Sequence, residues 1–384
     1  MLDLTTVPFT VDDIEPDSAG IWRYATFFPP VPEPGRLRLG EQVTPLLERP
    51  DLGVHLKLDH LLPSGSYKDR GACLLVSRLA HLGVHDVVLD SSGNAGAAIS
   101  AYCAAASIGC RVFVPAGNSP GKLAQIAAAG AEVVPVPGLR RDATNAARAA
   151  AAGTLYASHN WHPDFLAGLA SMGWEMWEQL GRRAPSAVVT PCGNGGIVLG
   201  LSRAFQALVE GGLLAAVPRI VAVQSQAFDA VARAMTDELP APRARSHGQT
   251  IAEGIACELP VRGRQLLAAL RRSGGVAIAV TDSQIRDAVL GLASSGIYVE
   301  PTAAVGLAGV AELRARGSGA VLGADPVVVL TGSGLKSGRA VADLRNPGWW
   351  PSAGPVIGAG RRSRAPAWSR APRWRSDRSP SAGR

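Results

Sequence analysis

The sequence predicts an α/β protein in which parallel or mostly parallel sheets are flanked by helices. Short Val- and Ile-rich runs alternate with longer Ala- and Leu-rich stretches from about residue 54 to residue 340. This alternation is typical of parallel strands joined by right-handed helical crossovers. Small polar or glycine-rich turns follow several of the strand-like runs. The chain of 384 residues is also long enough for about two to three domains with a large core.

The expected elements follow from hydrophobic patterning and length. The runs expected to form buried strands are Val87–Asp90, Arg111–Pro115, Glu132–Val136, Ala187–Thr190, Ile220–Gln224, Val276–Val280 and Val327–Thr331. The stretches expected to form helices are Ala72–Leu82, Ala95–Ser107, Gly121–Ala129, Thr144–Ala152, Leu166–Leu180, Ile197–Glu210, Ser283–Leu292 and Thr302–Arg314. The Pro-rich residues 1–50 are expected to be irregular.

The composition excludes several classes of protein. Hydrophobic residues make up 47% of the chain and charged residues 18%, which is typical of a globular enzyme or binding protein and not of a disordered chain. No apolar run reaches the length of about 18 residues that a membrane span needs, and the N-terminus lacks the pattern of a secretory signal. The five cysteines have no CxxC spacing. We therefore expect a cytoplasmic protein without a structural metal or a membrane partner.

The net charge of +7 comes from one end of the chain. Residues 345–384 hold nine Arg and one Asp, so the rest of the chain is close to −1. The positive net charge therefore gives little support for a nucleic-acid partner of the folded part. We expect this Arg- and Trp-rich segment to be a disordered basic tail. Binding of an anionic or nucleic-acid partner by the tail is the alternative.

Three turns that follow expected strands are rich in small polar residues, and ligands bind at such strand ends in open parallel sheets. Ser91-Ser92-Gly93-Asn94 precedes an Ala-rich helix and would suit a carboxylate; ordinary N-capping is the alternative. Gly193-Asn194-Gly195-Gly196 would suit a phosphate, although Val198 breaks the dinucleotide fingerprint, and a tight structural turn is the alternative. Thr331 begins the third turn and offers a neutral hydroxyl to a ring nitrogen; a glycine-rich exit loop is the alternative.

Lys68 is the most informative residue of the sequence. The chain contains only four Lys against 34 Arg, so each Lys is a candidate for a role that Arg cannot fill. Lys68 lies in Pro63–Gly71, where a turn leads into an expected helix. Burial and the positive end of the helix would lower the pKa of its amine, which suits a nucleophile. A solvated lysine in a first helical turn is the alternative.

Taken in order, these segments resemble the threonine synthase family of pyridoxal-5′-phosphate (PLP) enzymes, which have fold type II, the tryptophan-synthase-β-like fold. The resemblance extends from about Ile21 to Ser337 and includes Leu39–Leu46 and the motif at Ser64–Gly71, which is similar to the family's S/T-G-S-[FY]-K-D-R-G. Ile251–Ile255 and Glu300–Ala304 resemble segments of threonine dehydratases. The resemblance implies a two-domain enzyme with its active site in the cleft between the domains, and it implies roles for individual residues.

On this resemblance, Lys68 would bind PLP covalently and act as the general base. The other residues that the resemblance marks would bind the cofactor or the amino-acid substrate. They are Asn94 at the ring hydroxyl, Gly193, Asn194, Gly195 and Gly196 at the cofactor phosphate, Thr331 at the ring nitrogen, Ser91, Ser92 and Gly93 at the substrate carboxylate, and Lys122 and Ser171 elsewhere on the substrate. The neutral Thr331 hydroxyl would moderate the electron sink, which suits elimination and addition at the side chain.

The sequence departs from the family at the expected site of the substrate phosphate. Threonine synthases act on O-phosphohomoserine, and Phe165 and Ala170 stand where a cation can occur, while the Ser171 hydroxyl is kept. Fewer charge-assisted contacts would weaken phosphate binding. His159 and His162 could partly substitute, or could be structural. Elimination or replacement at Cβ of a serine- or threonine-type substrate therefore stays open as the alternative reaction. A regulator without activity is a third possibility, against which the retained Lys68 argues.

The resemblance also implies the organisation of the chain. We expect residues 1–85 to form an N-terminal segment and the first part of the large PLP domain, residues 86–175 the small α/β domain, and residues 176–344 the rest of the large domain. A homodimer is expected from the same resemblance.

Overall fold

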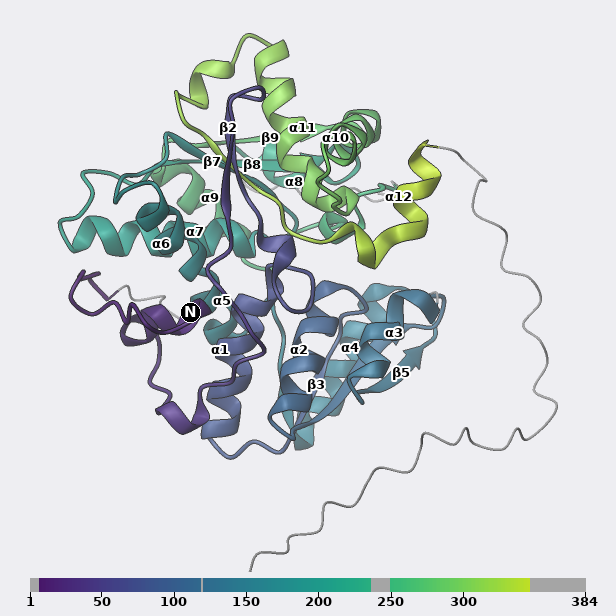
Figure 1. The fold of residues 1–384 in the computed structure, drawn as a ribbon. Helices are drawn as coiled ribbons and strands as arrows, with labels where there is room; N and C mark the ends of the chain where they lie inside the picture. The colour runs from purple at the N-terminus through teal and green to yellow at the C-terminus, as the bar shows by residue number, and fades with distance from the viewer. Residues whose placement is uncertain (1–6, 119, 236–248, 346–384) are drawn as a thin grey trace, which may run out of the picture.

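The computed structural model describes residues 7–118, 120–235 and 249–345, which form two sheets and the helices around them (Figure 1). The six-stranded sheet has the order β1-β2-β10-β7-β8-β9, in which β1 is antiparallel to β2 and all other neighbours are parallel. Its strands are β1 (Leu46–Arg49), β2 (Val54–Lys57), β10 (Val327–Val329), β7 (Ala187–Pro191), β8 (Arg219–Ser225) and β9 (Val276–Val280). We call this sheet with its helices the large half.

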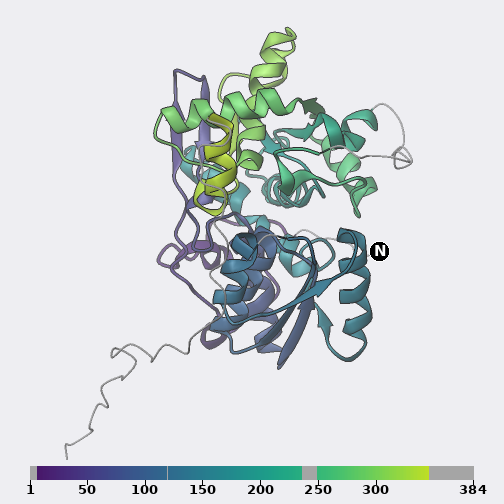
Figure 2. The same ribbon diagram turned by 90° about the vertical axis from the view of Figure 1, so that its right-hand side faces the viewer.

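The four-stranded sheet is entirely parallel and has the order β5-β4-β3-β6. Its strands are β5 (Glu132–Val136), β4 (Gly109–Pro115), β3 (Asp86–Leu89) and β6 (Leu155–Tyr156). We call this sheet and α2, α3 and α4 the small half, which lies below the large half in Figures 1 and 2. The parallel sheets confirm the fold class expected from the sequence.

Helices cover the sheets and join them. They are α1 (Lys68–His81), α2 (Asn94–Ala105), α3 (Pro120–Ala128), α4 (Arg140–Ala150), α5 (Pro163–Leu169), α6 (Ser171–Gln179), α7 (Gly196–Glu210), α8 (Ala230–Arg233), α9 (Gly263–Arg272), α10 (Asp282–Ser294), α11 (Pro301–Ala315) and α12 (Gly338–Arg345). Short 3-10 helices lie at Gly20–Phe27, Glu33–Gly35, Asp59–Leu61, Ala151–Gly153, Gln226–Phe228, Glu253–Ile255, Gly319–Val321 and Gly334–Ser337.

The central strands of the large half are buried on both faces. Val327 and Val329 pack into the core cluster that includes α1, α5, α6, α7 and α9, whereas Val328 packs into the cluster formed with α10 and α11. Alternate residues of a strand point to opposite faces, so a short all-valine strand suits this position. This double burial explains why the sequence shows these strands as continuous apolar runs.

All seven expected strands are confirmed, but some other expectations were wrong. Two helices begin four residues earlier than expected, α1 at Lys68 instead of Ala72 and α4 at Arg140 instead of Thr144. Residues 1–50 are not irregular throughout, because Leu46–Arg49 pairs with β2 as an antiparallel edge strand. The expected helix at 166–180 begins earlier, at Pro163, where the His162 ring accepts a hydrogen bond from the N–H of Asp164. It is divided at Ala170, whose N–H bonds to the carbonyl of Ala167 with the tighter spacing of a 3-10 turn.

Two further features concern partners. Within the described residues, no helix is long and apolar enough to cross a membrane. The same part of the chain contains no group of three or more His, Cys, Asp or Glu that could hold a metal ion. The expected disordered tail lies outside the described residues beyond Arg345.

Candidate active site

The turn before α1 fixes Lys68 as the first residue of that helix. The N–H of Ser64 donates to Asp69 Oδ2 at 2.7 Å, and the N–H of Tyr67 donates to the carbonyl of Thr331 at 3.0 Å. The backbones of Ser66 and Gly332 also pair in a single antiparallel β-bridge. The strand end at Thr331 and the start of α1 are thereby held together, although more than 260 residues separate them in the sequence.

Lys68 is half-buried between two aromatic rings. Its Nζ lies 4.5 Å from the ring centroid of Tyr67 and 5.8 Å from that of Phe165. Burial, with a smaller contribution from the charge of Arg140, lowers the pKa of Lys68 to about 7, while Glu300 opposes the shift. A lowered pKa is the expectation from the sequence, and burial is its main cause. A large fraction of this amine is therefore unprotonated at neutral pH, as a nucleophile or base requires.

Thr331 and Gly332 extend the site from the end of β10. The Oγ1 of Thr331 is buried and has no hydrogen-bond partner among the described residues. The carbonyl of Gly332 accepts a hydrogen bond from the N–H of Glu300 at 3.1 Å. A side chain at Gly332 would overlap the Glu300 carboxylate. The unsatisfied Thr331 hydroxyl is thus available to a polar atom of a ligand, since buried hydroxyls normally have a partner.

Asn94 meets Glu300 across the boundary between the two halves. The Nδ2 of Asn94 donates to Glu300 Oε1 at 2.8 Å. Burial raises the pKa of Glu300 to about 7, against the opposing influence of Lys336, Asn94 and Lys68. An amide nitrogen carries two N–H groups, so one remains for a ligand after this bond. Glu300 begins the segment that resembles threonine dehydratases, and this hydrogen bond places its carboxylate next to Asn94.

The Ser91–Asn94 turn lies at the end of β3, directly before α2. Gly93 occupies the N-cap position of α2, and no side chain caps the helix there. The first N–H groups of a helix have no acceptor within the helix. The alternative that Ser or Asn serves as an ordinary N-cap is therefore wrong here. This arrangement leaves N–H groups and the helix dipole for a carboxylate.

The Gly193–Gly196 turn lies between β7 and α7. Gly195 has a φ of +79° and would place a Cβ 2.7 Å from Leu266, so a side chain is excluded by both backbone conformation and space. A Cβ on Gly193 would lie 3.0 Å from the Cα of Ile255. The Asn194 Oδ1 is turned toward the N–H of Val261. Glycine backbone at a helix start suits the close approach of a phosphate.

Helix α5 links Lys68 to this glycine turn. Phe165 contacts Lys68 and packs so closely on Gly71 that a Cβ there would lie 2.6 Å from its ring. Leu169, one turn later on α5, would lie 3.4 Å from a Cβ on Gly196. The strands β10 and β7 that precede Thr331 and Gly193 are neighbours in the sheet. Lys68 and the glycine turn therefore lie at the same edge of the large half.

Of two other expected substrate residues, the structure places the side chain of Ser171 only. The Ser171 side chain is fully buried, accepts a hydrogen bond from Arg70 at 3.0 Å and donates to the carbonyl of Gly168 at 2.8 Å. These contacts occupy its hydroxyl within the protein interior. Lys122 lies in α3, but its side chain is outside the described part of the structure.

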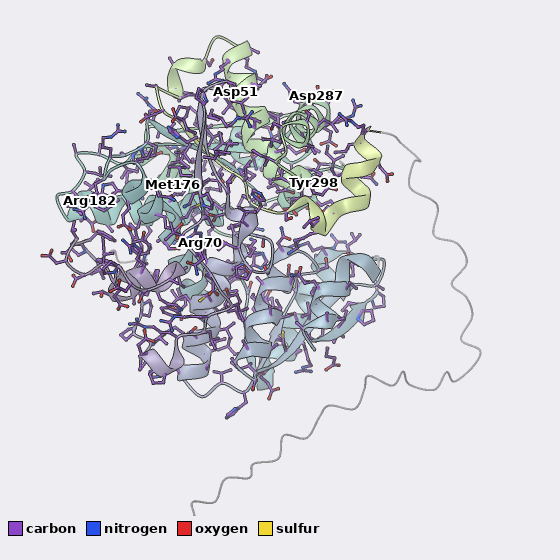
Figure 3. The ribbon with its side chains drawn as sticks, in the orientation of Figure 1. Asp51, Arg70, Met176, Arg182, Asp287 and Tyr298 are labelled. Carbon is purple, nitrogen blue, oxygen red and sulfur yellow. The ribbon has the colours of Figure 1, made fainter. Side chains whose placement is uncertain are left out.

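A buried network of charges supports the start of α1 and is not expected from the sequence. Arg70 forms ion pairs of 2.7 Å with Asp59 and Glu175, and Lys57 pairs with Glu175 at 2.7 Å. All four side chains are at most 1% exposed. Figure 3 shows Arg70 near the middle of the molecule. Strand β2, helix α1 and helix α6 are joined here, two residues from Lys68. No local sequence pattern signals such a network, because its members come from distant segments.

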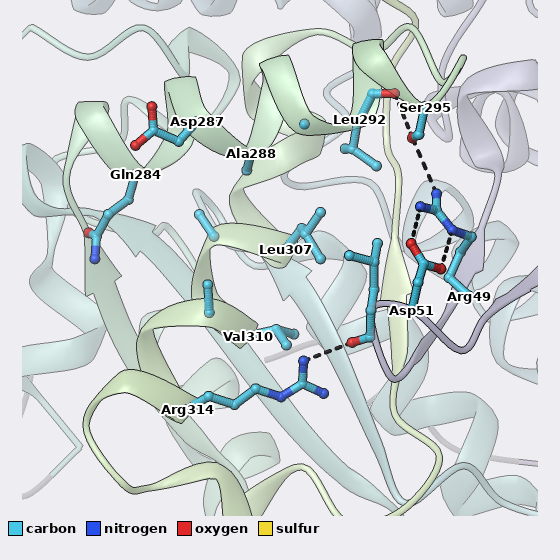
Figure 4. Close-up of a pocket in the computed structure, with 14 residues that line it drawn as sticks. Arg49, Asp51, Gln284, Asp287, Ala288, Leu292, Ser295, Leu307, Val310 and Arg314 are labelled. Carbon is cyan, nitrogen blue, oxygen red and sulfur yellow. Dashed lines mark hydrogen bonds and ion pairs between the residues drawn. The ribbon is translucent and has the colours of Figure 1, made fainter.

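A pocket of about 510 Å³ lies elsewhere (Figure 4). It is lined by α10, α11 and the turn between β1 and β2, including Asp51, Asp287 and Arg314. Asp51 and Asp287 lie at the top of Figure 3, away from the central Arg70. None of the candidate-site residues, such as Lys68, Asn94, Thr331 and the Gly193–Gly196 turn, lines this pocket, so we do not assign the site to it.

The comparisons with known proteins agree with this geometry. Residues 37–332 match the family model described as "Pyridoxal-phosphate dependent enzyme". The chain belongs to this family and has its fold type II architecture. It is a threonine synthase-like lyase that depends on pyridoxal phosphate.

Several similar proteins support the assignment as threonine synthase-like. The threonine synthase of Methanosarcina acetivorans is 31% identical over 354 residues, which cover 89% of this chain and 86% of that protein. The threonine synthase of Methanocaldococcus jannaschii is 33% identical, with 83% of this chain and 80% of that protein covered. Among solved structures, a threonine deaminase from T.th. matches with a TM-score of 0.65 and 28% identity, covering 76% of this chain and 92% of that one.

Proposed function

We propose that this enzyme acts on O-phosphohomoserine or a related amino acid, by removal of the α-proton, elimination from the side chain and re-addition of water. The names of its curated relatives support this substrate class. The single observation that carries the proposal is Lys68, a half-buried amine at a helix start with a pKa lowered to about 7. Bound PLP would supply the electron sink for the charge left when the α-proton departs.

Residues of both halves fit the cofactor. Lys68 would hold it covalently, and the Gly193–Gly196 turn would bind its phosphate through backbone N–H groups. The unsatisfied Thr331 hydroxyl would meet the ring nitrogen, and the second N–H of Asn94 would meet the ring hydroxyl. A buried polar atom without a partner is the feature expected of a site that a ligand completes.

The same residues suggest how protons and charges are handled. The free amine of Lys68 would take the α-proton, because its pKa is close to neutral. The backbone and hydroxyls of Ser91–Gly93 would hold the substrate carboxylate at the start of α2. Glu300, whose pKa is raised to about 7, could hold a proton next to Asn94.

The alternative reaction is elimination from a serine- or threonine-type substrate without a phosphate. The apolar, fully buried Phe165 and Ala170 favour it, since neither can pair with a phosphate. The similar threonine deaminase structure supports it as well. Release of a 2-oxo acid would distinguish this reaction from release of threonine.

A spectral screen of the holoenzyme tests the proposal. Amino acids and phospho-amino acids are added one at a time, the cofactor absorbance is recorded, and products are identified. We expect O-phosphohomoserine to change the spectrum and to yield threonine and phosphate. A 2-oxo acid from serine or threonine, with no product from O-phosphohomoserine, would support the alternative instead.

The wider organisation is also a proposal. We propose a large PLP domain from residues 1–85 and 176–344, a small domain from residues 86–175, a homodimeric assembly and a cytoplasmic location. We propose no nucleic-acid partner for the folded part, because its charge is close to neutral.

A further inference from the structure

The face of α4 that carries Arg140 is directed toward the proposed substrate site. Arg140 and Thr144 are four residues apart and share one face of this helix. Thr144 Oγ1 donates to Asp90, the residue directly before the Ser91–Asn94 turn. Tyr156 donates to the other oxygen of Asp90 at 2.6 Å and fixes this carboxylate. Arg140 therefore projects from the first turn of α4 on the side of the substrate-carboxylate turn.

The charge of Arg140 acts on three groups of the site. It lowers the pKa of Lys68 and, together with burial and Lys68, that of His159. It also lowers the pKa of the Cys257 thiol, against the larger upward effect of burial. Cys257 follows the Glu253–Ile255 segment beside Gly193. These effects agree with the position that the α4 geometry gives Arg140. Within the described residues, no acidic side chain pairs with the exposed Arg140. The nearby Asp142 instead accepts a hydrogen bond from the N–H of Leu139 at 2.7 Å.

His159 provides a second, independent feature at the same place. It is only 8% exposed, and its Nδ1 has no hydrogen-bond partner among the described residues. Its ring packs edge-on to Phe165 at 5.9 Å, the same ring that Lys68 contacts. The loop that carries it is held by Arg262, which donates to the carbonyls of Asn160 and Trp161. A buried, rigidly held imidazole without a partner is suited to a ligand.

We infer that Arg140 and His159 form the subsite for the distal anionic group of the substrate. This inference rests on the proposed function and specifies a phosphorylated or similarly anionic side chain. Arg140 supplies the full positive charge and His159 a hydrogen-bond donor. They take the place of the cations that are missing at Phe165 and Ala170, and they approach from the small half instead of from α5 and α6. Together they determine the preference for an anionic over a neutral side chain.

Binding of two matched ligands tests the inference. The dissociation constants of O-phosphohomoserine and L-homoserine, which differ only in the phosphate, are measured on the holoenzyme from the cofactor absorbance. We compare the wild type with Arg140→Gln, with His159→Phe and with the control Arg141→Gln. Arg141 is the adjacent exposed arginine of the same helix, and its charge is not among those that act on Lys68 or His159.

We expect the wild type to bind the phosphorylated ligand about 10- to 100-fold more tightly, as for a charge-assisted contact. Arg140→Gln should remove most of this preference, His159→Phe a smaller part, and Arg141→Gln none. The inference would be overturned if Arg140→Gln and Arg141→Gln showed the same preference for O-phosphohomoserine over L-homoserine. It would also be overturned if Arg140→Gln alone lost the cofactor, because Arg140 would then anchor the cofactor. A preference that depends on Arg140, combined with a 2-oxo acid product, would keep the subsite and reject the proposed reaction.

Discussion

Asn94 at the start of α2 and Glu300 directly before α11 are joined by a hydrogen bond of 2.8 Å that crosses from the small half to the large half. A second connection lies close by, where Gln125 and Lys336 both donate to the carbonyl of Ser64, at 3.0 and 2.8 Å. Ser64 belongs to the turn that leads to Lys68. The two halves are thus held together through the residues that surround the reactive amine.

The lowered pKa of Lys68 can be measured in the apoenzyme. The free amine reacts with an acylating reagent and its ammonium form does not, so reactivity rises with pH through the pKa. We expect half-maximal acylation of Lys68 near pH 7, followed by peptide mass spectrometry. Arg140→Gln should move the midpoint upward, because one of the charges that lower the pKa is removed. A midpoint close to the ordinary lysine value of 10.5 would contradict the burial of this amine.

Glu300 should make the apoenzyme less stable as the pH rises from about 5 to 8. Its pKa is about 7 in the folded state against an ordinary value of 4.5, so the folded state holds the extra proton between these values. The contribution of Glu300 to the free energy of unfolding is therefore fully present below the pKa of the unfolded state. It is lost as the pH rises through the pKa of the folded state. The effect is on the order of 3 kcal/mol. Glu300→Gln should remove this contribution, and urea unfolding at pH 5 and pH 8 measures it. The same difference between wild type and variant at both pH values would count against it.

Glu175 should be essential for stability, because it pairs with both Lys57 and Arg70 in the protein interior. Glu175→Ala leaves two buried cations short of a partner, which typically costs about 3–5 kcal/mol. Glu33→Ala is the control, since the Glu33 side chain is 59% exposed and pairs with Arg36 and Arg38 at the surface. Its loss should cost roughly 1 kcal/mol or less. Both variants are measured by urea unfolding. An equal loss of unfolding free energy in the two would contradict a stabilising role for the buried ion pairs.

Gly195→Ala should weaken cofactor binding about 10-fold or more, because a side chain is strained at a φ of +79° and would displace Leu266. Gly212→Ala is the matched control. Gly212 also has a positive φ, +72°, but lies beyond the other end of α7 with nothing within 4 Å of its Cβ position. Both variants should lose some stability, whereas only Gly195→Ala should raise the dissociation constant of PLP, followed by absorbance. Similar cofactor affinities in the two would remove the glycine turn from the site.

The sequence predicts the strands and most helices correctly because their patterns are local. Buried parallel strands such as β7 and β10 are continuous apolar runs, and the polar turns after them can be recognised next to each strand. The short strands β1, β2 and β6 are missed, since a few residues with mixed polarity carry little periodic signal. The start of α5 is missed because Pro163 and its His162 cap begin the helix before the first apolar repeat.

The site is predictable only where its residues stand in compact motifs. Lys68, the Ser91–Asn94 turn and the Gly193–Gly196 turn can each be proposed from the neighbouring residues. Arg140 cannot, because its relevance depends on the packing of α4 beside Asp90. The roles of Arg70 and Glu175 are missed for the same reason: a buried ion pair between residues more than 100 positions apart has no local signature.

The most direct test is to locate the cofactor on the chain. The purified holoenzyme is reduced with borohydride, which fixes PLP to the amine that holds it, and peptides are mapped by mass spectrometry. The chain has only four lysines, Lys57, Lys68, Lys122 and Lys336, so the result is unambiguous. We expect the cofactor mass on the peptide of Lys68 and none after substitution Lys68→Arg. The mass on another lysine, or on none, would contradict the site described for this enzyme.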